Sequence, residues 1–300
     1  MVRVSPDPFR REPLVSSLWE SARVRIVEPA RGRALVMGIV NVTPDSFSDG
    51  GRHNRVDDAV AHAWRLLDEG ADILDVGGES SRPGAAPVPL DEELRRVLPV
   101  IERLAARTST PLSIDTTKAE VARRALDAGA VVINDVSALR DDPAMLDVAR
   151  DSGAAVILMH MQGTPLTMQD DPRYDDVVAD VETFLRARIA ATVAAGVPIS
   201  RIAVDPGIGF GKKSAHNLSL LRRFERFAQL GCASVVGVSR KGVLAKIAPR
   251  PIDERAASSV AAALAAIARG ADVARVHDVA ATADAVRVWA AVGFDLSQTL

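Results

Sequence analysis

The sequence lacks the features of secreted, membrane and nucleic-acid-binding proteins. It has one cysteine, Cys232, so no internal disulfide can form, which fits a reducing compartment. Its formal net charge is −2, which disfavours a broad basic surface for nucleic acid. The longest weakly polar run, residues 256–268, is shorter than the roughly 20 residues of a membrane span. The first residues also lack the apolar run of a signal peptide. We therefore expect a soluble, cytoplasmic protein.

The composition is typical of a globular chain. Of 300 residues, 48% are hydrophobic and 25% charged, enough to build a large core. No linker and no second apolar cluster divides the chain. We expect one catalytic domain over residues 34–293, with an N-terminal extension (1–33) and a C-terminal tail (294–300).

Short apolar runs alternate with longer helical patterns. Strands are predicted at 34–40, 72–76, 112–114, 131–133, 155–159, 202–204, 234–238 and 273–276. Helices are predicted at 57–69, 91–106, 118–128, 142–151, 174–195, 216–230, 254–269 and 281–291, and most of them end at a glycine. Eight such units predict a single (β/α)8 TIM barrel. A doubly wound sheet is the alternative, but it would need a glycine-rich turn where Asn41 begins a different motif.

Polar residues gather where the predicted strands end. In such barrels the active site lies at the carboxyl ends of the strands. Asn41, Asp115, Asn134, Asp205, Lys241, Arg275 and His277 all stand at these positions. Side chains alternate along a strand, so Gly237, Ser239 and Lys241 share a face and Arg240 points outward. Val136, Met159 and Phe210 would form an apolar floor.

Each residue also has a simpler interpretation. Asp115 could cap the following helix, and Asp205 could shape the turn at Pro206. His160 is out of phase with Met159 and is expected to face away from the pocket. His62 and His216 are expected on helices and His53 in a loop, all without a catalytic role.

Two longer segments carry a family resemblance. Residues 37–51 and 75–84 resemble the two signature segments of dihydropteroate synthases. Six shorter motifs, at 113–116, 133–135, 158–163, 205–211, 239–241 and 275–278, match in the same order. The resemblance covers about residues 34–292, almost the whole chain outside the N-terminal extension.

The resemblance implies a reaction and a set of binding residues. Family members condense 6-hydroxymethyl-7,8-dihydropterin pyrophosphate with 4-aminobenzoate by dissociative, SN1-like chemistry, releasing pyrophosphate. It implies catalytic roles for Asp115, Asp205 and Lys241. It also implies a pterin pocket made of Asp115, Asn134, Val136, Met159, Asp205, Phe210, Gly237, Lys241 and Arg275.

The resemblance also implies where the other reactants bind. Pyrophosphate would contact Asn41, Arg275 and His277, with Mg²⁺ held by Asn41. Aminobenzoate would contact Phe47, Ser81, Arg82, Pro83, Ser239 and Lys241, under lids formed by residues 43–51 and 79–86. Ser81 stands where many relatives have threonine, which bears on sulfonamide sensitivity. A homodimer is the typical family assembly.

Two other functions remain as alternatives. A methyltetrahydrofolate:corrinoid methyltransferase would share Asp115, Asn134 and Asp205, but has little need for the motifs at 41–47 and 81–83. A catalytically silent pterin-binding barrel would be expected to have lost Lys241, Asp205 or His277, all of which are present.

Overall fold

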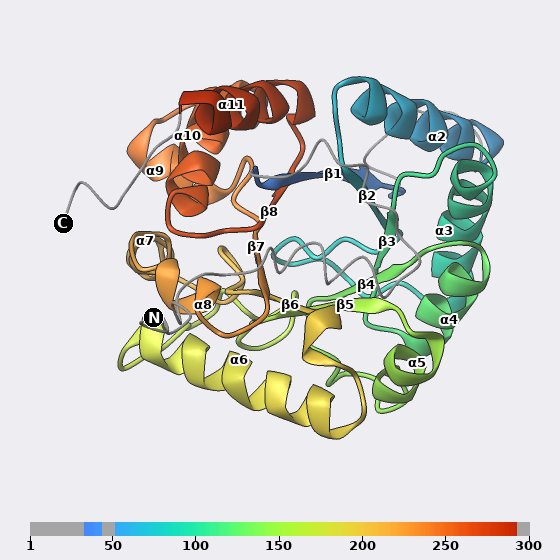
Figure 1. Ribbon diagram of the computed structural model, residues 1–300, viewed down its shortest axis with the longest axis horizontal. Coiled ribbons are helices and arrows are strands. Elements are labelled where there is room, and N and C mark those ends of the chain that lie inside the picture. Colours follow the sequence, from blue (N-terminus) through green and yellow to red (C-terminus); the bar gives the residue numbers. More distant parts are fainter. Residues whose placement is uncertain (1–32, 44–51, 293–300) are drawn as a thin grey trace, which may run out of the picture.

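The eight predicted strands form a closed barrel. The computed structural model describes residues 33–43 and 52–292, with the backbone alone for residues 52–55. The strands are parallel, and each pairs with the next until β8 returns to β1, so the predicted TIM barrel is confirmed (Figure 1). Their bounds are β1 (Leu35–Asn41), β2 (Ile73–Gly77), β3 (Leu112–Asp115), β4 (Val132–Asp135), β5 (Ala155–Met159), β6 (Ile202–Asp205), β7 (Ala233–Val236) and β8 (Val273–Val276).

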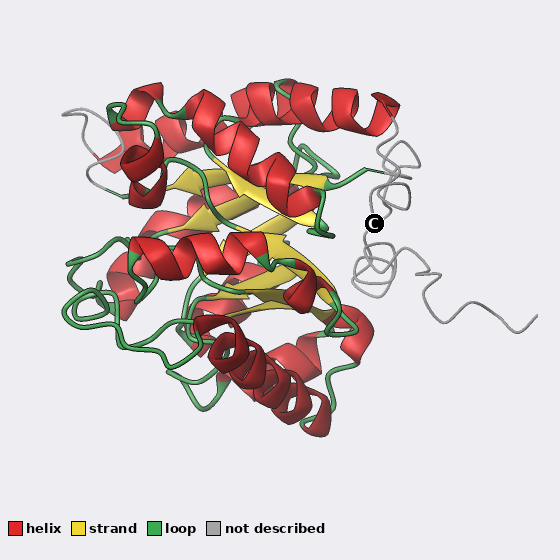
Figure 2. Cartoon of the chain, turned by 90° about the vertical axis from the view of Figure 1, so that its left-hand side faces the viewer, coloured by secondary structure: helices red, strands yellow, loops and turns green. Residues whose placement is uncertain are grey.

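Helices cover the outside of this barrel (Figure 2). They are α2 (Arg52–Asp68), α3 (Leu90–Ala105), α4 (Ala119–Asp127), α5 (Met145–Ser152), α6 (Val177–Ala194), α7 (Ser214–Arg222), α8 (Glu225–Ala228), α9 (Gly242–Ile247), α10 (Ala256–Ile267) and α11 (Val279–Val292). Two 3-10 turns, η3 (Ile199–Arg201) and η4 (Ile252–Glu254), complete the described part. Within that part, no helix has the length and apolarity to cross a membrane.

Alternation along the strands divides the core into two layers. Inward side chains such as Met37, Val132 and Ile157 fill the barrel interior. Outward side chains pack against the apolar faces of the helices. On α3 the inward face is Val97, Val100, Ile101 and Leu104, a spacing of three to four residues. Because both faces of each strand are covered, the strands read as continuous apolar runs in the sequence.

Two predictions of local structure were wrong, and one helix was missed. The helix predicted over 216–230 is two helices, α7 and α8, because the backbone leaves the helical region at Arg223 and buries Phe224 and Phe227 against each other. The short helix α9 was not predicted. His53 was expected in a loop but lies in α2.

Candidate active site

Strand register brings several predicted site residues side by side. Asn41, Gly77, Asp115 and Asn134 are successive partners across β1 to β4, at the carboxyl ends of these strands. Met159 and Asp205 are partners at the ends of β5 and β6. These residues therefore share one rim of the barrel.

Arg275 joins two carboxylates at the mouth of the barrel. Its Nε lies 2.6 Å from Asp75 Oδ2 and its Nη2 lies 2.6 Å from Asp115 Oδ2. The amide of Asn134 donates to the same Asp75 oxygen at 3.0 Å. Asp75 is fully buried, whereas the Arg275 side chain is 20% exposed. Asp115 is therefore held by an ion pair, and its alternative interpretation as a helix cap was wrong, since α4 has Lys118 at its N-cap.

Asp205 and Lys241 face each other across Gly237. A Cβ placed on Gly237 would lie 3.4 Å from Asp205 Oδ2 and 3.8 Å from Lys241 Nζ. Asp205 Oδ1 accepts a hydrogen bond from the amide of Gly207 at 2.7 Å, so this residue also shapes the turn. Lys241 Nζ donates to the carbonyl of Ile208 and lies 4.5 Å from the centre of the Phe210 ring.

The side chains predicted as an apolar floor pack together. Val136, Met159, Met161 and Met168 form one buried cluster, and Phe210 packs against it. His160, between two of these methionines, turns away and packs edge-on against Phe184 of α6 at 4.8 Å. The prediction that His160 faces away from the pocket is confirmed.

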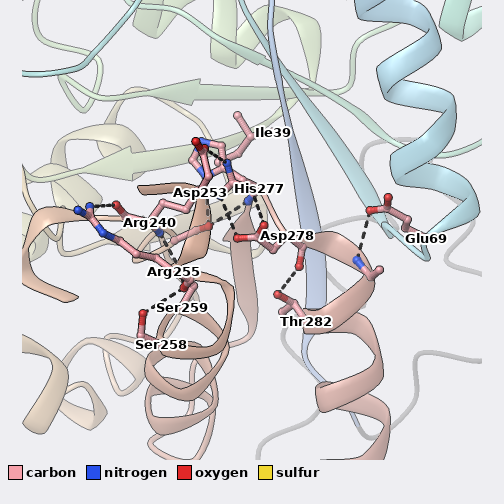
Figure 3. Close-up of polar contacts among 12 residues, drawn as sticks. Ile39, Glu69, Arg240, Asp253, Arg255, Ser258, Ser259, His277, Asp278 and Thr282 are labelled. Carbon is pink, nitrogen blue, oxygen red and sulfur yellow. Dashed lines mark hydrogen bonds and ion pairs between the residues drawn. The ribbon is translucent and has the colours of Figure 1, made fainter. Parts of the chain in front are cut away.

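Polar contacts around Arg240 and Asp278 fasten the β7–α9 and β8–α11 loops together (Figure 3). Arg240 has a φ of 58° and donates to both oxygens of Asp278 at 2.6 and 3.1 Å. Its backbone amide donates to Ser259 Oγ at 2.9 Å. Arg240 thus points away from the pocket, as predicted. The Ser239 hydroxyl lies 3.1 Å from both the amide and Nδ1 of His277, so it is bonded to the β8 loop.

A cavity of about 310 Å³ opens beside Asp115. It lies under the β2–α3 loop, between Ser80, Ser81 and Ala85 on one side and Thr164 to Leu166 on the other. Ser81, Asp115 and Val136 are the predicted site residues that line it. Arg82 and Pro83 are exposed on the same loop. Phe47 and most of the first predicted lid lie outside the described residues.

Burial shifts the pKa of several of these groups. Desolvation, reinforced by Asp75 and other carboxylates, raises the pKa of Asp115 to about 7 despite the ion pair with Arg275. Desolvation also raises the pKa of Asp205. It lowers the pKa of Lys241 to about 8 and that of His277 to about 4. Perturbed groups gathered at one rim are typical of an active site.

Two buried residues of the site were not predicted. Asp75 accepts hydrogen bonds from Arg275 and Asn134 and so orients both side chains. The sequence held a signal for this residue, because it is a lone carboxylate at an inward position of an apolar strand. Lys212 is 3% exposed and donates to His160 Nδ1 and the carbonyl of Phe210, both at 2.9 Å. Its position in a glycine-rich loop gave no sign of burial.

Comparisons with known proteins agree with this geometry. A family model described as "Pterin binding enzyme" matches residues 37–277. The dihydropteroate synthase of Escherichia coli K12 is 48% identical over 253 residues, which is 84% of this chain and 89% of that protein. The solved dihydropteroate synthase of Xanthomonas albilineans with 4-aminobenzoic acid is 56% identical, with a TM-score of 0.82, covering 87% of this chain and 93% of the other. The same enzyme in complex with 7,8-dihydropteroate is 53% identical, with a TM-score of 0.79, covering 87% and 94%.

The closed barrel, its polar rim and the family match define a pterin-binding (β/α)8 enzyme. Within that class, the sequence identity to dihydropteroate synthases and the share of both chains that is aligned are high. The chain belongs to the dihydropteroate synthase family.

Proposed function

We propose that this protein condenses 6-hydroxymethyl-7,8-dihydropterin pyrophosphate with 4-aminobenzoate to give 7,8-dihydropteroate and pyrophosphate. The observation that carries the proposal is the gathering of two carboxylates, an amide and two cations over an apolar floor on one rim. Relatives described with 4-aminobenzoic acid and with 7,8-dihydropteroate support the choice of substrates.

The Asp205 side of the site would bind the pterin. A pterin edge carries adjacent N–H donors, and a carboxylate accepts two parallel hydrogen bonds from such an edge. Asp205 Oδ2 lies toward Gly237, while Oδ1 accepts from the amide of Gly207. Asn134 has donor and acceptor groups for the remaining ring atoms. Met159 and Phe210 would contact the faces of the ring.

Asp115 would stabilise the developing cation. Loss of pyrophosphate leaves positive charge at the pterin methylene, and a fixed carboxylate next to it lowers the barrier electrostatically. Asp115 is held in place by Arg275, so little reorganisation is needed. Arg275 lies on the partly open side of the rim and would bind the leaving pyrophosphate together with His277 and Asn41.

Asn41 fits the magnesium role that the family resemblance implies. It is a half-exposed residue at the end of β1, and magnesium prefers oxygen ligands and keeps several waters or phosphate oxygens. Over the described ranges, no group of three or more His, Cys, Asp or Glu residues could hold a metal by itself. Bound Mg²⁺ would offset the charge of the pyrophosphate.

The β2–α3 loop would carry aminobenzoate. Ser81 lines the cavity beside Asp115, and Arg82 supplies a cation for the carboxylate of this substrate. Pro83, Ser239, Lys241 and Phe47 keep the roles that the family resemblance implies. The arylamine is neutral near pH 7, so the attack needs no strong general base. A closed loop would exclude the water that competes for the cation.

Domain limits, assembly and location are also part of the proposal. The catalytic domain would span residues 34–293. A homodimer is supported by exposed apolar side chains on α9 and α11, among them Ile247, Val288 and Val292. A reducing, cytoplasmic location is supported by the single cysteine, which is buried.

Pyrophosphate release tests the proposed function. With dihydropterin pyrophosphate and aminobenzoate together, stoichiometric pyrophosphate and 7,8-dihydropteroate are expected. Product formation without aminobenzoate, or methyl transfer from methyltetrahydrofolate to a corrinoid, would contradict the proposal. Pterin binding with no turnover would instead favour the silent barrel.

A further inference from the structure

The β2–α3 loop is closed at its base by one carboxylate. Glu79, just after β2, accepts a hydrogen bond from the amide of Val88 at 3.1 Å, which brings the two ends of the loop together. At its tip, the amide of Gly84 donates to the carbonyl of Pro165 at 3.0 Å. Ser81, Arg82 and Pro83 lie between these two fastenings.

Lys118 fastens the base of this loop to the neighbouring strand. Its Nζ lies 2.5 Å from Glu79 Oε2 and 2.5 Å from Glu93 Oε2. Glu93, in the first turn of α3, is fully buried. Its other oxygen accepts from Thr116 Oγ1 at 2.6 Å. Thr116 directly follows Asp115, so these bonds join the loop to the strand that carries Asp115.

The absence of a side chain at Gly78 lets the start of the β2–α3 loop lie close to Glu93 of α3. A Cβ on Gly78 would lie 2.8 Å from Val97 Cγ1 and 3.1 Å from Glu93 Cγ, so only glycine fits there. Glu79, Glu93, Thr116 and Lys118 all line the 310 Å³ cavity together with Ser81 and Asp115. The ion-paired group is therefore a wall of the cavity and not a remote surface feature.

The charge balance keeps the group together. Two carboxylates share one ammonium, and Lys118 and Glu79 are each about one quarter exposed. Charge-assisted hydrogen bonds in such partly buried positions are stronger than those on the open surface. Losing the lysine would leave Glu93 buried without its cation and would release Glu79 from the β3–α4 loop.

We propose that Lys118 is a positioning residue that holds the β2–α3 loop in place for the second substrate. This rests on the proposed function, because it takes Ser81, Arg82 and Pro83 as the aminobenzoate contacts. Lys118 acts through Glu79 on the loop and through Glu93 and Thr116 on the strand. It need not touch either substrate.

Lys118→Met, which keeps length but removes charge, is the test. The KM for aminobenzoate is expected to rise about tenfold, the scale of one charge-assisted hydrogen bond. The KM for dihydropterin pyrophosphate is expected to stay within about twofold of the original. Lys118→Arg should recover most of the loss because it restores the cation.

Arg33→Met is the matched control. Arg33 pairs with both oxygens of Asp72 at 2.7 and 2.9 Å, with side chains 16% and 20% exposed, at the opposite end of the barrel. It should lower thermal stability without changing either KM. A rise in the aminobenzoate KM in Lys118→Met but not in Arg33→Met would show that Lys118 positions the loop and does not act only through overall stability.

Hydrogen exchange provides a readout without turnover. Residues 79–88 should exchange faster in Lys118→Met than in the wild type and in Arg33→Met. If Lys118→Met fails to fold, Glu79→Gln is expected to give the same faster exchange. Unchanged exchange together with an unchanged aminobenzoate KM would overturn the inference. If the wild type forms no dihydropteroate at all, the proposed function fails, and the exchange result still tests the loop fastening.

Discussion

Asp75→Asn is the most informative substitution in the site. It replaces one carboxylate oxygen with an NH2 group at the residue that orients Arg275 and Asn134. Asp75 Oδ2 accepts from Arg275 at 2.6 Å and from Asn134 at 3.0 Å. Asparagine keeps the shape but removes the charge, and where its NH2 group replaces one carboxylate oxygen it can donate but not accept, which leaves one carbonyl oxygen as acceptor. Arg275 would then keep Asp115 as its one charged partner among those described.

The cost in stability follows from burial. Breaking a buried ion pair by removing one partner costs about 3–5 kcal/mol. Arg275 retains Asp115 and is partly exposed, so we expect the free energy of unfolding to fall by roughly 2–3 kcal/mol. Urea denaturation at pH 8 measures this fall.

The effect on pH dependence has a definite sign. Asp75 helps to raise the pKa of Asp115 to about 7, so removing its charge must lower that pKa. If ionised Asp115 is needed for catalysis, kcat/KM of the wild type rises as the pH increases through about 7. In Asp75→Asn the rise should move to lower pH, while the maximum falls because Arg275 and Asn134 lose their orientation.

Asp72, a carboxylate in a second arginine pair, serves as a control that separates the loss of stability from the shift of the pH profile. Asp72→Asn removes a charge from the Arg33 pair at the other end of the barrel. It should lower the free energy of unfolding but leave the pH at which kcat/KM rises unchanged. If Asp75→Asn also leaves that pH unchanged, Asp75 has a structural role alone and the electrostatic reasoning is refuted.

Three further predictions concern the substrates. Asp205→Asn should weaken pterin binding by at least about 100-fold, the scale of losing a bidentate charged pair, and unchanged calorimetric affinity would contradict its assigned role. Lys241→Met should abolish the fall in kcat/KM expected as the wild-type lysine loses its proton above about pH 8, and a fall that persists would show that another group titrates there. Sulfonamides should compete with aminobenzoate, and noncompetitive inhibition would place their site elsewhere.

Stability should also depend on Asp115. Its pKa is raised from an ordinary value of 3.8 to about 7, so the folded state binds more protons than the unfolded state between these values. The free energy of unfolding is therefore expected to fall as the pH rises from about 4 to about 7. A carboxyl group whose pKa is lowered by folding would have the opposite effect. Asp115→Asn should reduce this slope, as followed by thermal unfolding at several pH values, while the raised pKa values of Asp205 and Asp135 keep the remainder.

Much of the fold was predictable because buried parallel strands are apolar on both faces. All eight strands were found within two residues of their observed ends, and glycines such as Gly153, with a φ of 71°, marked the helix ends correctly. The break between α7 and α8 was not predictable, since Phe224 and Phe227 fit a helical pattern equally well and only their mutual packing favours the break.

The site was predictable where chain position fixes side-chain direction. Residues at strand ends, such as Asp115 and Asp205, converge because the barrel closes. Asp75 could have been found as a carboxylate at an inward position of an apolar strand, but its partners could not, because Arg275 lies 200 residues further along the chain. Lys118 was missed because its two partners, Glu79 in the β2–α3 loop and Glu93 in α3, lie 39 and 25 residues away in the sequence, and no local pattern encodes their meeting.

A crystal structure of this protein with 7,8-dihydropteroate would test the central claim most directly. The account predicts the pteridine over Met159 and Phe210, with its N–H edge on Asp205 and its amide contacts on Asn134. The aminobenzoate part should lie under Ser81. A pteridine bound away from Asp205 and Asn134 would contradict the account.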